Sequence, residues 1–376
     1  MEREVKEMAW TEMQEQAIHK KGKNMIVSAG AGSGKTAVLS ERILTYCKEG
    51  KDICSFLVLT FTNAAAQEMK ERIRKKLLEH NLKEQASRID VADITTFDAY
   101  SLSLVKKYYF YLGIDKNISI MDQALLEVKK KELLDQLFEE NYTSKNTQFF
   151  SLLKKYTKQS DENLKGIILS LFQKLELIVD ENQFVNTYEE NYYSKKFVQN
   201  IIHTFEELVL RKSKNFVNEL VKLLECASED TESKKLADTI EALLPSKPFT
   251  SYEEAYEFLS TLALPRLSSN ASLAVKEQKT FCGEELKQLK TKYFSKYSTL
   301  KAAEEEIYAI KEDVLYLLEL ALEVQKRLYQ YKLELMSFDY MDIAKMAIRL
   351  VQNNATVLSE IKNGFTEILI DEYQDT

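Results

Sequence analysis

Glycine and proline are scarce in this chain, and both are concentrated in short stretches. The 376 residues contain only 9 glycines and 3 prolines. Three of the glycines fall within residues 30–34, and all three prolines fall within residues 245–265. Because these two residue types end helices and form turns, their scarcity favours long helices and argues against a many-turned β-sandwich. We therefore expect helix to dominate.

The length and composition exclude several classes of protein. A chain of 376 residues exceeds what one hydrophobic core usually serves, so two domains, or one domain with a large insertion, are expected. The net charge of −7 argues against a protein that coats nucleic acid over its whole surface, so any DNA or RNA contact must be local. The four cysteines form no CxxC pair and no zinc-ligand spacing with a histidine, so we interpret them as reduced thiols of a cytoplasmic protein. No segment has the pattern of a signal peptide or a membrane span.

Strand and helix patterns alternate at the two ends of the chain. Continuous apolar runs bounded by turn residues indicate buried strands, and apolar residues three and four apart indicate helices. This alternation predicts an α/β fold with a parallel sheet. The expected strands are residues 24–28, 56–60, 92–95 and 365–370, and the expected helices run from the glycine cluster to about Cys47 and from about Asn63 to Leu78.

Between residues 116 and 336 the strand signals disappear, and the pattern is helical throughout. The last helix of this block, residues 302–335, carries apolar residues from Ile307 to Leu335 at alternating steps of three and four. This spacing predicts one helix of about 34 residues, roughly 50 Å long, with a seam for another helix. We expect it to be a spine on which neighbouring helices pack, and the alternative is an arm that binds a partner.

The glycine cluster has the pattern of a phosphate-binding loop. It follows an expected strand and opens an expected helix, a setting in which backbone N–H groups can surround phosphate oxygens. Lys35 would reach the β and γ phosphates, and Thr36 would bind Mg²⁺. The first position is alanine where the strict pattern has glycine. The loop consists of Ala29, Gly30, Ala31, Gly32, Ser33, Gly34, Lys35 and Thr36.

Two acidic residues, Asp371 and Glu372, directly follow the expected strand 365–370. In a parallel sheet of this kind the carboxyl ends of the strands face the nucleotide. Asp371 would hold Mg²⁺, and Glu372 would orient or deprotonate the attacking water, as phosphoryl transfer to water requires. The alternative is that both belong to an ordinary acidic tail.

Polar residues and one aromatic residue follow the expected strand 56–60. Phe61 could stack on a base, while Thr62 and Asn63 could hold phosphates. The alternative for Phe61 is a core aromatic between strand and helix. The next helix is basic over residues 70–76, which could steer a phosphate backbone, but its i,i+4 pairs are equally typical of a solvated helix.

Four motifs in order carry a resemblance to a known family. They are WTEMQ at residues 10–14, the loop AGAGSGKT at 29–36, TFTNAAA at 60–66 and DEYQDT at 371–376. The chain resembles the N-terminal part of superfamily-one DNA helicases of the UvrD/Rep type. Within that superfamily it is most similar to the A subunits of bacterial ATP-dependent helicase/nucleases (AddA type). The features that favour this subgroup are Ala64, the large helical insertion and the segment SFDYMDI at 337–343.

The resemblance implies a fold and a set of site residues. It implies a RecA-like ATP-binding domain made of residues 1–115 and 337–376, interrupted by a helical domain at 116–336. It implies ATP and Mg²⁺ as cofactors, Gln14 as the residue that reads adenine, and Gln374 as a sensor of the γ-phosphate beside Glu372 and Lys35. Asp98 stands where the family typically has histidine. The residues implied to bind single-stranded DNA are Thr60, Phe61, Thr62, Asn63, Thr96 and Phe97.

The resemblance also implies an activity and a partner. The full-length protein would be an ATP-driven single-strand DNA translocase and helicase in double-strand break repair, acting with a B subunit. The family's later motifs, with the arginines of a second motor domain, lie beyond residue 376, so we expect a fragment with weak Mg·ATP binding and negligible turnover. The alternative function is a nucleotide-gated protein-interaction module, whose working surface would be the helical block.

Overall fold

The computed structural model describes residues 10–22, 24–30, 32–157 and 160–375, and of Asp375 only the backbone. The chain forms two compact units. The first comprises Met1–Phe138 with Val324–Thr376, and the second comprises Glu139–Glu323. The division expected from the sequence, with boundaries at 115/116 and 336/337, concerns functional domains and stays a prediction.

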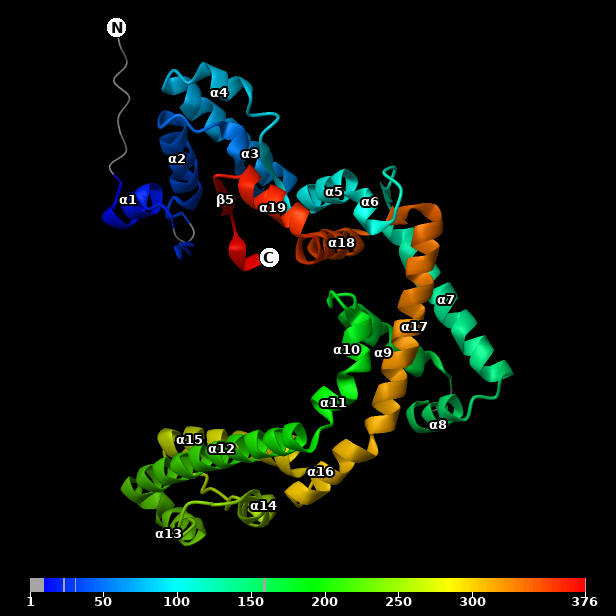
Figure 1. The fold of residues 1–376 in the computed structure, drawn as a ribbon. Coiled ribbons are helices and arrows are strands. Elements are labelled where there is room, and N and C mark those ends of the chain that lie inside the picture. Colours follow the sequence, from blue (N-terminus) through cyan, green and yellow to red (C-terminus); the bar gives the residue numbers. More distant parts are fainter. Residues whose placement is uncertain (1–9, 23, 31, 158–159, 376) are drawn as a thin grey trace. The chain divides into compact units, whose positions relative to one another are not determined.

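The first unit contains a small parallel sheet and the helices around it (Figure 1). The loop at residues 29–36 leads into its second helix, and the acidic pair follows its last strand. The elements are α1 (Glu12–His19), α2 (Lys35–Lys48), β1 (Phe56–Thr60), α3 (Asn63–Glu79), α4 (Lys83–Ser87), β2 (Asp93–Thr96), α5 (Phe97–Lys107), α6 (Tyr109–Leu112), β3 (Ser119–Ile120), the larger part of α7 (Gln123–Thr143), the end of α17 (Lys311–Leu335), β4 (Ser337–Phe338), α18 (Tyr340–Asn353), α19 (Ala355–Gly364), β5 (Glu367–Ile370), and short 3-10 turns at Ile53–Ser55 and Tyr373–Asp375.

The three-stranded sheet has the order β2-β1-β5, and both strand pairs are parallel. All five residues of the central strand β1 are buried. Side chains from α2 and α3, among them Ile43, Leu44 and Ile73, pack against β1 to form the core. The strands predicted at 56–60, 92–95 and 365–370 are therefore confirmed, each within two residues.

The strand predicted at residues 24–28 is wrong. These residues have no strand pairing, and Met25, Ile26 and Val27 are exposed, Ile26 to 85%. An apolar run predicts burial only if a neighbouring strand supplies the backbone partners that pairing requires. No described residue pairs with the outer edge of β5, and Ile368 on that strand is 50% exposed.

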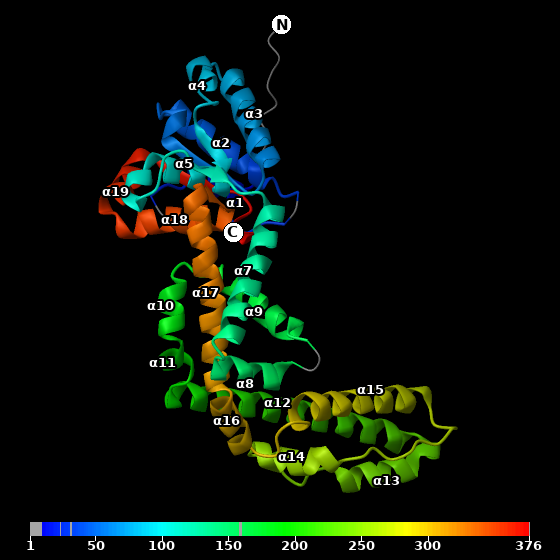
Figure 2. The same ribbon diagram turned by 90° about the vertical axis from the view of Figure 1, so that its right-hand side faces the viewer.

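A second core of this unit lies where α18 packs beside α5 (Figures 1 and 2). The short parallel pair of β3 and β4 adjoins it. At the start of α18, Asp339 and Asp342 form a capping box, which satisfies backbone N–H groups at the helix start. The ammonium group of Lys332, which is only 4% exposed, donates to both aspartates at 2.7 Å. This buried ionic cluster fixes the end of α17 to the start of α18.

The described residues of the second unit form helices and the connections between them, with no strand. Its longest helix, α12, has 35 residues and runs side by side with α15, while α13 and α14 also pack on α12 (Figures 1 and 2). The core between these helices includes Tyr252, whose hydroxyl lies 2.8 Å from two backbone carbonyl oxygens. The further elements of this unit are α8 (Thr147–Tyr156), α9 (Glu162–Leu175), α10 (Glu181–Asn186), α11 (Tyr188–Tyr192), α12 (Lys195–Glu229), α13 (Lys234–Leu243), α14 (Tyr252–Thr261), α15 (Leu273–Leu289), α16 (Leu300–Ala309), a 3-10 turn at Thr231–Ser233 and a π-helical turn at Lys290–Phe294.

The single long helix predicted at residues 302–335 is two helices, α16 and α17. The break is at Ile310, whose φ of −91° and ψ of −3° stay close to helical values, so the three- and four-residue spacing continues across it. The predicted seam is buried from Leu317 to Leu328, but Ile310 and Leu335 at its ends are exposed. Periodicity thus identified the apolar stripe without revealing that the helix is interrupted.

No helix in the described part of the chain is both long and apolar enough to cross a lipid bilayer. All four cysteines are free, as the sequence predicted. Burial raises the pKa of the Cys47 thiol to about 12 and that of Cys282 to about 11, so neither is a reactive thiolate near neutral pH.

Candidate functional site

The loop before α2 has the backbone of an anion-binding turn. Gly32 and Gly34 adopt left-handed conformations, with φ of 76° and 85°, which side chains with a Cβ rarely adopt. Gly34 is the N-cap of α2, and no side chain caps the helix there. The first N–H groups of α2 thus have no side-chain acceptor among the described residues and point toward the loop, where they can bind a phosphate. Ala31 lies outside the described residues.

The acidic pair after β5 lies next to this loop. The Nζ atom of Lys35 is 3.7 Å from an Oε atom of Glu372 and 3.3 Å from the carbonyl oxygen of Ala29. The backbone N–H of Asp371 donates to the carbonyl of Leu59 at 2.9 Å, which extends the pairing of β5 with β1 up to the acidic pair. Residues 336 positions apart in the sequence, from Lys35 to Asp371, therefore meet at the carboxyl edge of the sheet.

The two carboxylates differ in their surroundings. Burial raises the pKa of Asp371, while the nearby cations Lys35 and Arg72 counteract this shift. Glu372 has a φ of 52°, an uncommon conformation for a residue with a Cβ, and its N–H donates to the Asp371 carboxylate at 3.1 Å. The side-chain amide of Gln374 donates to the Glu372 carboxylate. Glu372 is thus held between Lys35 and Gln374.

The Gln14 side chain connects the first helix to the loop. Its Oε1 accepts from the backbone N–H of Thr11, completing a capping box at the start of α1, and its Nε2 donates to the Ser33 carbonyl at 3.1 Å. A Cβ built on Gly34 would lie 3.5 Å from the same Nε2. The predicted adenine-reading residue therefore lies against the loop at residues 29–36.

An arginine that the sequence reasoning missed joins three elements of the site. Arg42 on α2 is buried and donates two hydrogen bonds to the Glu367 carboxylate on β5, one of them at 2.7 Å. It also donates to the carbonyl oxygens of Ala17 at 2.8 Å and Ile18 at 3.2 Å, at the end of α1. The hydrogen bonds to Glu367 are the main reason that the pKa of Arg42 is raised. The cluster thus holds α1, α2 and β5 in a fixed relation to one another.

The residues proposed to bind DNA lie at the same edge of the sheet. Thr60 and Thr96 end the neighbouring strands β1 and β2 and are direct partners in the pairing register. The hydroxyl of Thr62 caps α3 and that of Thr96 caps α5. Phe61 is 62% exposed, so its interpretation as a core aromatic is wrong. Asn63 is also exposed, and Phe97 is half-buried.

Comparison with known proteins decides the family. The model of the UvrD/REP helicase N-terminal domain family matches residues 10–224 and 156–376, which together cover nearly the whole described chain. The chain belongs to this family. Proteins named as the A subunit of an ATP-dependent helicase/nuclease are similar to it: 28% identical in Pediococcus pentosaceus over 97% of this chain, 29% in Bacillus licheniformis over 98%, and 30% in Clostridium novyi over 98%. The chain spans about a third of the length of each of these relatives, 32%, 33% and 32% respectively.

The oxygen donors of this UvrD/REP-family chain fit a magnesium ion that arrives with a nucleotide. Asp371 and Thr36 could each supply one ligand oxygen. Among the described residues there is no group of three or more His, Cys, Asp or Glu side chains that could hold an ion by themselves. Mg²⁺ commonly takes one or two protein carboxylates and completes its shell with phosphate oxygens and water. The donor set therefore suits Mg²⁺ bound together with a triphosphate.

Four of the basic side chains on helix α3 of this UvrD/REP-family chain form ion pairs, two within the helix and two with residues outside it. Arg72 pairs with Glu68 at 2.7 Å, and Lys75 lies 4.0 Å from Glu79. Arg74 pairs with Asp90, and Lys76 pairs with Glu41 on α2 while lying over the ring of Trp10. These pairs favour the interpretation of α3 as a solvated, packed helix over a surface that steers DNA.

Proposed function

We propose that this chain is the ATP-binding part of a DNA helicase motor, with a RecA-like domain that binds Mg·ATP at the carboxyl edge of the β2-β1-β5 sheet. The observation that carries the proposal is the meeting of Lys35 with Glu372 at 3.7 Å beside a loop whose glycines adopt left-handed conformations. Helix N-termini and lysine ammonium groups are favourable partners for phosphate. Membership of the UvrD/REP helicase family supports ATP as the nucleotide.

Each residue of the site has a proposed task. The first N–H groups of α2 and the Lys35 ammonium bind the phosphates, and Thr36 with Asp371 holds Mg²⁺. When bound, the ion neutralises part of the phosphate charge. Glu372 accepts a proton from the attacking water at a carboxylate oxygen. Its carboxylate is held in place by contacts with the side chains of Lys35 and Gln374. Gln14 contacts the adenine base from its place against the loop.

We further propose that single-stranded DNA binds at the neighbouring strand ends, through Thr60, Phe61, Thr62, Asn63, Thr96 and Phe97. The pairing of Thr60 with Thr96, and of Leu59 with Ile370, supports a direct mechanical link between this site and the acidic pair. The whole protein would then translocate on and unwind DNA during double-strand break repair, together with a B subunit. The names of the helicase/nuclease relatives support this helicase role. The free cysteines support the cytoplasm as its location.

Equilibrium binding of a fluorescent, non-hydrolysable ATP analogue with Mg²⁺ tests the nucleotide site. Lys35→Ala should weaken binding about 10- to 100-fold, because a charge-assisted hydrogen bond to phosphate is lost. Lys48→Ala is the matched control, since it removes the same charge from an exposed position at the other end of α2. Equal affinities of the two variants would contradict the proposed phosphate contact.

Fluorescence anisotropy of a labelled single-stranded oligonucleotide tests the DNA site. The double substitution Thr62→Ala/Asn63→Ala should weaken binding, whereas Thr62→Ser should retain both the hydroxyl and the cap of α3. A protein that binds the analogue but no oligonucleotide at low salt would favour the alternative function, a nucleotide-gated protein-interaction module.

A further inference from the structure

Five aromatic side chains form a continuous series across α10, α11 and the start of α12 in the second unit. Neighbouring ring centroids lie between 4.5 and 6.3 Å apart: Phe184 with Tyr188 at 5.4 Å, Tyr188 with Tyr192 at 4.5 Å, Tyr188 with Tyr193 at 6.3 Å, and Tyr192 with Phe197 at 5.2 Å. We call these five residues the aromatic series. Its spacing is that of rings in direct contact.

The rings of the aromatic series are only partly covered by the rest of the unit. No residue of α10 or α11 is buried, and each ring of the series remains partly exposed, Tyr192 to 37%. The large core of this unit is formed by other side chains, from α12 to α16, and includes none of the five. Aromatic rings that contact one another yet stay open to solvent are available to stack on a flat ligand.

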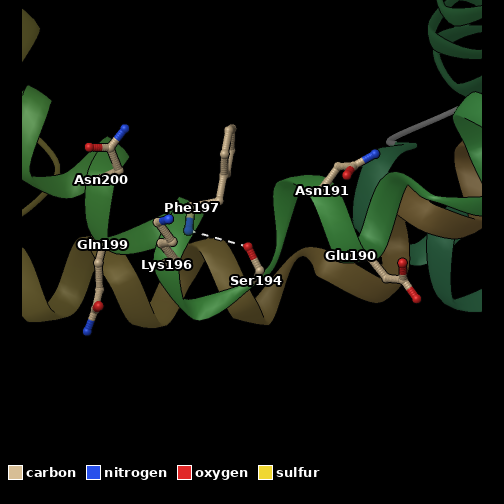
Figure 3. A pocket seen from close by; sticks show the side chains of 7 residues that line it. All are labelled: Glu190, Asn191, Ser194, Lys196, Phe197, Gln199 and Asn200. Atoms are coloured by element: carbon tan, nitrogen blue, oxygen red, sulfur yellow. Dashed lines mark hydrogen bonds between the residues drawn. The ribbon is translucent and has the colours of Figure 1, made fainter.

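A shallow depression of about 610 Å³ adjoins the end of the series (Figure 3). The ring of Phe197 rises from α12 between Asn200 on one side and Asn191 on the other. The amide group of Asn200 forms no hydrogen bond with any other described side chain or backbone group and lies on the same side of α12 as the Phe197 ring, whereas Gln199 points the other way (Figure 3). The depression is lined by Glu190, Asn191, Ser194, Lys196, Phe197, Gln199 and Asn200.

The charge around the depression is favourable to an anion. Lys195 and Lys196 at the start of α12 are exposed and form no salt bridge within the described part of the chain. Glu189 is already paired with Lys311 at 2.8 Å, which leaves Glu190 as the opposing charge. The start of α12 thus presents two ammonium groups to an anion, beside Glu190, the one carboxylate that lines the depression.

We propose that the aromatic series and this depression form a second binding site for single-stranded DNA. Bases would stack on Tyr192 and Phe197, the Asn200 amide would bind a base edge, and Lys195 and Lys196 would contact phosphates. A protein partner fits less well, because it would have to supply hydrogen-bond and charge partners for the amides, the hydroxyl and the charges of the lining as it buries them. The site lies in the second unit and requires neither the ATP site nor the strand ends of the first.

The first test measures binding of a labelled (dT)12 oligonucleotide by anisotropy in the Thr62→Ala/Asn63→Ala background, so that the two DNA sites are separated. Adding Tyr192→Ala/Phe197→Ala should weaken the remaining binding about 5- to 100-fold, the range for lost base stacking. Tyr308→Ala is the matched control, because Tyr308 is also 37% exposed and lies elsewhere in the same unit. An oligonucleotide of equal charge with abasic sites should bind weakly to both proteins and show no difference between them.

A second measurement does not depend on an alanine substitution in the cluster. Trp10 is the only tryptophan of the chain, so the double variant Trp10→Phe/Phe197→Trp has a single tryptophan, located in the aromatic series. Saturating (dT)12 should quench the emission of this tryptophan. The abasic oligonucleotide should leave the emission unchanged. Separately, Lys195→Ala/Lys196→Ala should reduce the salt dependence of log K by about 1.4, since each single-strand phosphate contact contributes about 0.7.

The outcomes separate this inference from the proposed function. If Thr62→Ala/Asn63→Ala abolishes all binding and the aromatic substitutions change nothing, the second site is refuted and the strand-end site stands. If the aromatic substitutions remove binding while Thr62→Ala/Asn63→Ala has no effect, the second site stands and the strand-end site fails. Unchanged emission of the tryptophan at saturating oligonucleotide also refutes the inference.

Discussion

Replacing Arg42 by methionine should destabilise the first unit, because it removes the cation that joins α1, α2 and β5. The Arg42 side chain is 5% exposed and Glu367 is 20% exposed. Removing one partner of a buried ion pair typically costs about 3–5 kcal/mol of unfolding free energy. Tyr46 still donates to Glu367 at 3.2 Å, and water reaches part of that carboxylate, so we expect the lower end of the range, about 3 kcal/mol.

Urea denaturation followed by tryptophan fluorescence measures this loss. Trp10 is the only tryptophan and packs against Ala17, Ile18 and Val38, so its emission follows the first unit and not the second. With a denaturant dependence of about 1–3 kcal/mol per molar urea, a loss of about 3 kcal/mol should lower the midpoint by about 1–3 M. The affinity for the ATP analogue should fall as well, because the same cluster positions α1 and β5 around the loop.

The double variant Arg42→Met/Glu367→Leu makes the reasoning refutable. It removes both charges, so no carboxylate is left without its cation, and its loss should be smaller than that of Arg42→Met alone. Arg42→Lys keeps the charge but cannot reproduce the forked contact, so it should lie between Arg42→Met and the natural protein. A single variant within about 0.5 kcal/mol of the natural protein, or a double variant that loses more than the single one, would refute the account.

Two further predictions use the same denaturation assay. Lys332→Met should cost about 3–5 kcal/mol of unfolding free energy, because it leaves two buried aspartates without their cation. Burial raises the pKa of Asp342, so Asp342→Asn should change the unfolding free energy by less than about 1 kcal/mol. A larger loss for Asp342→Asn than for Lys332→Met would contradict this account of the ionic cluster. Burial raises the pKa of Asp93, although the charges of Lys107 and Lys70 act in the opposite direction. The native state therefore disfavours the ionised carboxylate. The stability that Asp93 contributes is present at low pH and is lost as pH rises from about 4 through the native pKa. Asp93→Asn should therefore be more stable than the natural protein at pH 7, with a difference that shrinks toward pH 4; a difference that grows in acid would show the wrong sign.

Local patterns in the sequence predicted the parts of the fold that local chemistry determines. The run from Phe56 to Thr60 is apolar throughout and lies in the middle of the sheet, where both faces are covered. The glycines of the loop were identified because left-handed backbone is difficult for other residues. The rule that parallel strands end at a common edge placed Asp371 and Glu372 at the carboxyl edge of the sheet, where Glu372 lies 3.7 Å from Lys35.

Long-range partners could not be read from the sequence. Arg42 lies four residues from both Val38 and Tyr46, on the buried face of α2, and a cation on such a face requires an acceptor. That signal could have identified Arg42, but Glu367 lies 325 residues away, and nothing local selects it from the other acidic residues. The prediction of a strand at residues 24–28 was wrong for a related reason. A strand needs a neighbouring strand to pair with, and the residues of the run do not specify that neighbour.

The open side of β5 has a consequence for handling the protein. The backbone donors and acceptors on this side pair with no strand in the described part of the chain and lie beside the exposed Ile368, so they form a template on which a strand of another molecule can add. Concentrated solutions should therefore associate by edge-to-edge pairing, and dilution or a charged residue at position 368 should reverse it. The strand that carries the acidic pair at its end thus also carries an edge prone to association.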